Sequence, residues 1–265
     1  MSAPLEGSVS GVGRLGSWVI DAVDGVGEFA LLAWLTLRAA LRPRFPWLEC
    51  LRQLESIGAR SSTIVLITAL FTGMVLALQT GIALARFGAK PYVGSVVGLS
   101  LARELGPVLT ALMVGGRVGA GITAEIGAMQ VTEQVDAIRS MGADPVQKLV
   151  LPRVIAATLA LPLLTVLADV IGVLGGLLLA WSQFGIDPNF YIQTIVNTVT
   201  LGDFFSGIVK TFVFGWLIAM VGCSMALQTS GGTVGVGRAT TRAVVVASIG
   251  VLVTDFFLTQ LMVIL

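Results

Sequence analysis

Two adjacent charged residues, Arg103 and Glu104, lie inside a hydrophobic stretch that is long enough to cross a lipid bilayer. A charge at the bilayer centre costs roughly 2.5 to 3.5 kcal/mol, so it needs a partner or water. Neighbouring residues of a helix point in different directions, so these two cannot neutralise each other face to face. We expect each to find a further partner, such as Lys210, Asp255 or Asp169, or a lipid headgroup in a wet cavity.

The sequence lacks the usual groups of catalytic and metal chemistry. It has no histidine, which removes imidazole ligands and imidazole general bases. The two cysteines are Cys50 and Cys223, and no group of cysteines or carboxylates has metal-ligand spacing. No GxxxxGK(S/T) motif is present, so the chain has no phosphate-binding loop for a nucleotide. Any energy that drives it must come from an ion gradient, a partner or the substrate's own gradient.

Composition identifies an integral membrane protein. Hydrophobic residues make up 55% of the chain, charged residues make up 12%, and the mean hydropathy is +0.94. The apolar runs are continuous rather than alternating, which favours helices over the strands of a barrel. We therefore predict an all-α protein with five membrane-spanning helices of about 20 residues or more. They are expected at residues 61–85, 92–116, 154–182, 206–229 and 243–265.

The distribution of Lys and Arg predicts the orientation. Twelve of these residues lie before the first span, between the second and third, or between the fourth and fifth, whereas two lie on the other side. Positive residues favour the cytoplasmic ends of membrane helices. The N-terminus is therefore predicted to be cytoplasmic and the C-terminus to be on the opposite side.

Residues 1–60 are predicted to form an N-terminal segment ahead of the membrane domain at 61–265. Apolar residues recur at steps of three or four over residues 15–42, and Trp18 and Trp34 suit the headgroup region. Pro43 and Pro46 should end this helix. It is interpreted as an amphipathic helix in the membrane interface, as a helix packed under the bundle, or as both; a tilted crossing also stays open.

The longest loop between spans, residues 125–153, contains a second amphipathic segment at residues 132–141. Gly142 breaks this helix, and Asp144 is placed to cap the turn that begins at Pro145. A short helix held between two spans has the shape needed to enter a groove on a soluble partner. A solvated surface helix without a partner is the alternative.

Two long segments carry a resemblance to a known family. They are LSLARELGPVLTALMVGGRVGAGITAEIGAMQVTEQVDAIRSMGADPVQKLVLPR, at residues 99–153, and GVGRATTRAVVVASIGVLVTDFFLT, at residues 235–259. Both resemble the permease subunit of the Mla lipid transporter, in the MlaE family of ABC permeases associated with MCE proteins. The similarity extends from about Ser61 to the C-terminus, while the first sixty residues resemble the family loosely.

The resemblance implies a non-enzymatic transporter subunit and its partners. The expected assembly is a homodimeric permease with a cytoplasmic ABC ATPase dimer, a small STAS-domain subunit and a hexameric periplasmic MCE-domain protein. The cargo would be phospholipid, moved between the inner and outer membranes of a Gram-negative bacterium to maintain outer-membrane asymmetry, in the retrograde direction. ATP and Mg²⁺ would bind the partner ATPase and not this chain, which has no expected cofactor, metal or nucleic acid.

The resemblance also gives roles to particular residues. The segment 132–141 becomes the coupling helix that seats on the ATPase through Glu133, Asp136 and Arg139. A cavity for two acyl chains would be framed by the first and fifth spans of the dimer. Its candidate lining residues, all on or just after the first span, are Leu70, Met74, Leu76, Leu78, Gln79 and Phe87.

Two interpretations of the intramembrane charges remain. In the first, Arg103 attracts the lipid phosphate, Glu104 tunes the site, and Lys210 and Asp255 form a polar link between the fourth and fifth spans. In the second, these charges and Asp169 hold helices together without contacting cargo.

Two other classes of function are weighed against the permease. A secondary transporter would use Arg103, Glu104, Asp169 and Asp255 as a proton relay, but it predicts two related halves, and the sequence shows no such repeat. A lipid-modifying intramembrane enzyme would need a nucleophile with a base, and no recognisable pair is present.

Overall fold

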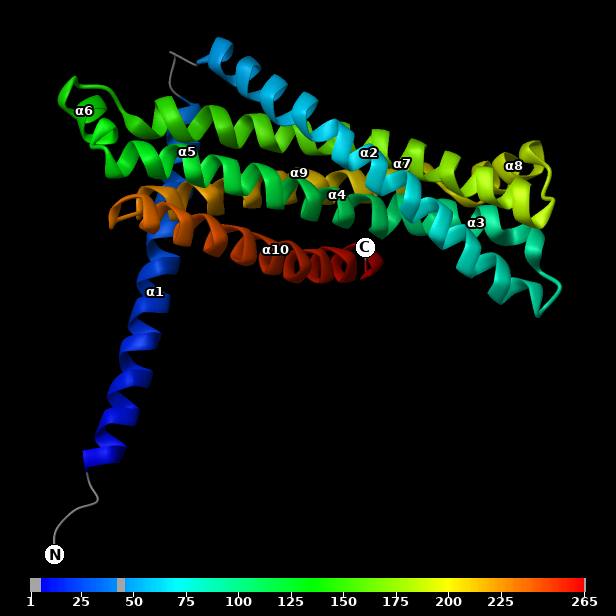
Figure 1. The fold of residues 1–265 in the computed structure, drawn as a ribbon, viewed down its shortest axis with the longest axis horizontal. Helices are drawn as coiled ribbons and strands as arrows, with labels where there is room; N and C mark the ends of the chain where they lie inside the picture. Colours follow the sequence, from blue (N-terminus) through cyan, green and yellow to red (C-terminus); the bar gives the residue numbers. More distant parts are fainter. Residues whose placement is uncertain (1–5, 42–45, 265) are drawn as a thin grey trace, which may run out of the picture.

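The computed structural model describes residues 6–41 and 46–264, with the side chains of residues 23–41, 46–262 and 264. Every regular element among these residues is helical (Figure 1). The predicted break at Pro43 and the side chain of Trp18 lie outside the described part. The all-helical prediction is therefore confirmed for the part of the chain that is described.

Within the described residues, five continuous helical segments, called rods below, are long and apolar enough to cross a membrane, which confirms the predicted number. The first is α2 (Trp47–Ala85), which begins well before the predicted boundary at residue 60. Charged residues lower the hydropathy of its first turns, but they do not interrupt the helix. The other rods cover Lys90–Val131, Val146–Phe184, Leu201–Leu227 and Gly232–Met262.

The second and third rods are built from several pieces. The second contains η1 (Lys90–Tyr92), α3 (Val93–Ser100), η2 (Leu101–Leu105), α4 (Gly106–Val114), η3 (Gly115–Gly119) and α5 (Ala120–Val131). The third contains η4 (Val146–Val150) and α7 (Leu151–Phe184). In η2, η3 and η4 the helix widens to π geometry, which is rare and is often found at functional sites.

The remaining elements complete the bundle. Between the second and third rods lies α6 (Gln134–Ser140), and α8 (Pro188–Thr198) precedes the fourth rod, α9 (Leu201–Leu227). The last rod is α10 (Gly232–Ile264). Figure 1 places α6 at one end of the bundle and α8 at the other.

Glycines bring α2 and α7 into backbone contact. A Cβ added at Gly73 would overlap the carbonyl oxygen of Gly172, and one added at Gly175 would overlap the carbonyl oxygen of Leu70. Small residues allow membrane helices to approach this closely. The two helices therefore form one tightly packed pair.

The later part of the N-terminal helix α1 (Glu6–Ala40) crosses the bundle at the end that carries α6, and its earlier part projects away from the bundle (Figure 1). The ring centroids of its Phe29 and of Trp216 on α9 lie 6.0 Å apart in an edge-to-face arrangement, and Leu32 is buried. Trp34 and Leu37 on the other side are exposed. One face is thus packed under the bundle, while the opposite face stays available to a membrane interface.

Candidate functional site

The intramembrane charges lie where the second rod is interrupted. Pro107 follows η2 and has no N–H, so the carbonyl of Arg103, four residues earlier, loses its usual helical donor. The ammonium of Lys210, on α9, donates to that carbonyl at 3.2 Å. A proline in one helix therefore creates an acceptor for a cation on another.

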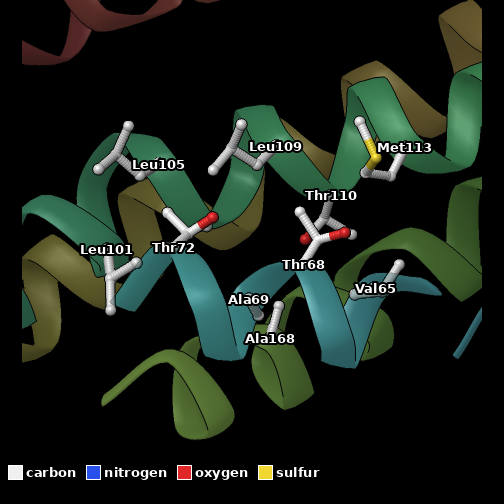
Figure 2. Close-up of a pocket in the computed structure, with 11 residues that line it drawn as sticks. Val65, Thr68, Ala69, Thr72, Leu101, Leu105, Leu109, Thr110, Met113 and Ala168 are labelled. Carbon is white, nitrogen blue, oxygen red and sulfur yellow. The ribbon is translucent and has the colours of Figure 1, made fainter. Parts of the chain in front are cut away.

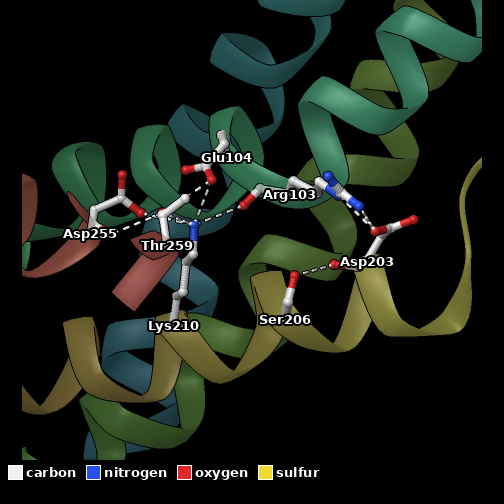
Figure 3. Close-up of polar contacts among 7 residues, drawn as sticks. All are labelled: Arg103, Glu104, Asp203, Ser206, Lys210, Asp255 and Thr259. Atoms are coloured by element: carbon white, nitrogen blue, oxygen red, sulfur yellow. Dashed lines mark hydrogen bonds and ion pairs between the residues drawn. The ribbon is translucent and has the colours of Figure 1, made fainter. Parts of the chain in front are cut away.

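Lys210 is the centre of a polar cluster that joins three rods (Figure 3). Its Nζ donates to Glu104 Oε1 at 2.8 Å and to Thr259 Oγ1 at 2.7 Å, and lies 3.2 Å from Asp255 Oδ1. The hydroxyl of Thr259 also donates to Glu104 at 3.1 Å. The Lys210 side chain is 2% exposed. The structure thus brings Glu104, Lys210 and Asp255 together across η2, α9 and α10.

Arg103 has a different partner, which the sequence interpretation missed. Its guanidinium is hydrogen-bonded to Asp203 through Nε at 2.6 Å and ion-paired with it through Nη2. Asp203 also accepts from the backbone N–H and hydroxyl of Thr200, and the Thr200 hydroxyl accepts from the Asp203 N–H. This reciprocal arrangement is a capping box at the start of α9. The Thr-x-x-Asp spacing was the signal that could have identified it.

Charge is nearly balanced within the two groups. Two cations, Arg103 and Lys210, face three carboxylates on Glu104, Asp203 and Asp255. Lys210 is enclosed, whereas the Arg103 side chain is 52% exposed. Of these two cations, Arg103 is therefore the one that an anionic ligand can reach. Among the described residues, no three His, Cys, Asp or Glu side chains gather where they could hold a metal ion.

Asp169 does not join this cluster. It lies on α7, is buried, and its Oδ1 packs against Gly106, where η2 joins α4. That oxygen has no hydrogen-bond partner among the described residues. Asp169 therefore does not pair with Arg103 or Glu104, contrary to the sequence prediction, because those two residues bind Asp203 and Lys210 instead.

A narrow groove lies between α2 and the second rod. Its open space is about 10 Å³, and Thr68 and Thr72 of α2 converge there with Leu105, Leu109 and Met113 (Figure 2). This volume suits one water molecule and is far too small for an acyl chain. A lipid cavity would therefore need surfaces beyond this groove.

The six residues proposed to face acyl chains are spread around α2 and its end. Leu70 packs against α7, with its Cδ1 near Gly175. Met74, Leu76 and Leu78 are half-buried against the core near α3 and α8. Gln79 is exposed, and Phe87 is exposed in the turn beyond α2. Their role as a lining stays a prediction.

The predicted coupling segment is a shorter helix than expected. Thr132 and Glu133 form a turn, Glu133 with a φ of 60°, and α6 begins at Gln134. Val135 of α6 is fully buried, whereas Asp136 and Arg139 are exposed and paired with each other at 3.0 Å. The positive φ turns the chain between α5 and α6 and explains the later start of the helix.

An ion pair near α6 joins the two neighbouring rods. Arg153 of α7 is 5% exposed in its side chain and lies 2.8 Å from Glu125 of α5. It also donates to the carbonyl of Leu149 at 2.7 Å. Sequence reasoning counted Arg153 only as a loop charge, because the predicted third span began one residue later.

The sequence is similar to one family model and to several known proteins along most of its length. Residues 50–261 match the family described as Permease MlaE. The chain is 37% identical over 257 residues to the intermembrane phospholipid transport system permease protein MlaE of Haemophilus influenzae, covering 96% of this chain and 98% of the relative. It is 42% identical to a probable ABC transporter permease protein of Rickettsia typhi, covering 94% and 96%. It is also 38% identical to the chloroplastic TRIGALACTOSYLDIACYLGLYCEROL 1 protein of Arabidopsis thaliana, covering 87% and 66%.

Proposed function

The chain belongs to the MlaE permease family, a family of multi-pass ABC transporter permeases, and we propose that it is the membrane subunit of an ATP-driven phospholipid transporter. The observation that carries this proposal is the similarity to the Haemophilus intermembrane phospholipid permease over almost the whole of both chains. The proposed location is a Gram-negative inner membrane. The proposed direction is retrograde, from the outer to the inner membrane.

The proposed partners supply what this chain lacks. An ABC ATPase dimer would bind and hydrolyse ATP, and α6 would seat on it. The exposed charges Glu133, Asp136 and Arg139 face outward from the buried anchor Val135, which supports that contact. The small STAS-domain subunit would bind on the cytoplasmic side, and an MCE-domain hexamer would receive or deliver lipid on the periplasmic side.

The proposed homodimer is supported by the exposure of α10. Only 11% of its most apolar window is buried within the chain, against 28% to 50% for the other four rods. Its uncovered side chains include Val253, Phe256 and Phe257. A second copy of the chain would enclose a wide apolar space between α10 and α2, which would hold the acyl chains.

We propose that Arg103 contacts the lipid phosphate from its exposed side while Asp203 holds its other side. An arginine has five donors, so one carboxylate does not saturate it. Glu104 would limit the positive charge near the phosphate, and Lys210 with Asp255 would hold α9 against α10. The capping box of α9 would fix the position of the guanidinium.

The test is reconstitution. The chain, co-expressed with its ATPase, STAS-domain and MCE-domain partners, would be placed in vesicles with a labelled phospholipid, and transfer to a second vesicle population would be followed. Transfer should require ATP and a functional ATPase, and should run toward the permease vesicles. Transfer driven by a proton gradient without ATP would reject the proposal in favour of secondary transport.

The headgroup role has its own variants. Arg103→Ala should lower the phospholipid that co-purifies with the complex and the rate of transfer, while Arg103→Lys should retain part of both. The matched control is Arg86→Ala, because Arg86 is an exposed arginine outside the cluster. Equal lipid content in Arg103→Ala and the control would leave the transporter assignment intact and remove the phosphate contact.

A further inference from the structure

Asp169 is a buried carboxyl that the proposed transport mechanism does not use. Its residue is 8% exposed, and it lies in the middle of α7, within a membrane-spanning rod. Neither of its oxygens takes part in a hydrogen bond or ion pair among the described residues, and Oδ1 is fully enclosed. Such a position is very unfavourable for an ionised carboxylate.

The cations on α7, η2 and α9 are each bound to a carboxylate other than Asp169. On α7 itself, the other charged residue is Arg153, which pairs with Glu125. On η2, Arg103 pairs with Asp203, and on α9, Lys210 pairs with Glu104 and Asp255. The charged residues of α2 lie in its first turns, from Glu49 to Arg60, and the stretch that packs against α7 has none. The helices α3, α4 and α8, which also pack against α7, contain no charged residue, so no described element that packs there offers Asp169 a counter-ion.

The surroundings instead fit a small neutral group. Oδ1 occupies the space that a side chain at Gly106 would fill. The nearby carbonyl oxygen of Leu101 already accepts from the Gly106 N–H across the π turn. Oδ1 meets no hydrogen-bond donor here, and an ionised carboxylate can only accept, whereas the O–H of a neutral acid can donate.

Water has a place close to this carboxyl. The groove of about 10 Å³ between α2 and α4 has Gly106 and Ala168 in its wall. Gly106 is the residue against which Asp169 packs, and Ala168 precedes it in the chain. A single water there would lie beside Gly106, and Asp169 itself is not among the residues that line the groove.

We propose that Asp169 is a proton-binding site within the membrane, whose neutral carboxyl holds α7 against the junction of η2 and α4. Because η2 carries Arg103 and Glu104, the bound proton helps to position the polar cluster. Loss of the proton would place an uncompensated charge at that junction and force α7 and η2 apart. Proton binding at Asp169 involves residues of this chain alone and is independent of the transported cargo.

Infrared spectroscopy of the purified protein in lipid nanodiscs tests the proton directly. A neutral carboxylic acid has a C=O stretching band above those of carboxylates and amides. The difference spectrum between the wild type and Asp169→Asn at pH 7 should show this band, and ¹³C labelling of aspartate carboxyls should shift it in the wild type. The matched control, Glu55→Gln, removes an exposed carboxyl and should show only carboxylate bands. Absence of a label-sensitive acid band in the wild type would overturn the proposal.

Two substitutions separate neutral packing from charge. Asp169→Asn keeps the shape without an ionisable group, whereas Asp169→Glu keeps the group but adds a methylene where Gly106 leaves no room. The midpoint of thermal unfolding should stay close to that of the wild type for Asn and fall by about 2–12 °C for Glu, as overpacking does. An Asn variant that is much less stable than the wild type would show that a neutral side chain of the same shape cannot replace the carboxyl, and would overturn the proposal.

Discussion

Lys210→Met removes the cation that three rods share. Glu104 and Asp255 would then remain near each other without a counter-ion, and the carbonyl of Arg103 would lose its donor. Removing one partner of a buried ion pair costs about 3–5 kcal/mol. For a chain of this size, that corresponds to a fall of about 6–20 °C in the unfolding midpoint. The measurement is thermal unfolding in nanodiscs, followed by tryptophan fluorescence.

A matched control and a rescue variant make this test specific. Lys90→Met makes the same change at an exposed lysine and should leave the midpoint unchanged. The triple variant Lys210→Met/Glu104→Gln/Asp255→Asn removes all the charges and should recover most of the loss, because neutral replacements of buried ion pairs are often tolerated. A small loss in the single variant, or no recovery in the triple variant, would refute the view that unpaired charge is the cause.

Three further changes test other parts of the structure. Gly73→Ala should sharply lower the yield of folded protein, because its Cβ would overlap the backbone of α7, whereas Gly116→Ala, where nothing lies within 4 Å, should leave the yield unchanged in size-exclusion chromatography. Asp203→Asn should weaken the α9 cap by about 0.5–2 kcal/mol and release Arg103, which is measured as lower stability together with altered lipid content. Val135→Asp should detach α6 from the core and lower ATP-driven transfer more than it lowers ATP hydrolysis by the complex; equal losses would contradict the proposed coupling role.

Hydropathy was enough to predict five spans because each rod contains a long apolar window. It could not predict where the rods end, since a helix continues through charged turns, as α2 does from Trp47. The π turns η2 and η3 do not change the spacing of apolar residues, so the sequence gives no signal for them.

The partners of the intramembrane charges were only partly predictable. Lys210 and Asp255 were recognisable because both interrupt apolar stretches, and the structure places them 3.2 Å apart. Asp203 was overlooked because it precedes the predicted fourth span, although its spacing from Thr200 is that of a capping box. The missing N–H of Pro107 leaves the carbonyl of Arg103 without its helical donor, but only the fold shows that Lys210 of α9 reaches it.

The glycine contact between α2 and α7 limits how this molecule can change shape. Two backbones that touch at Gly73 and Gly172 cannot slide or tilt independently without breaking their contact. The two helices would therefore move together as one rigid body in any conformational change of the transporter. α10 is the rod least enclosed by its own chain, and any movement of it away from α9 would have to break the contacts of Asp255 and Thr259 with Lys210.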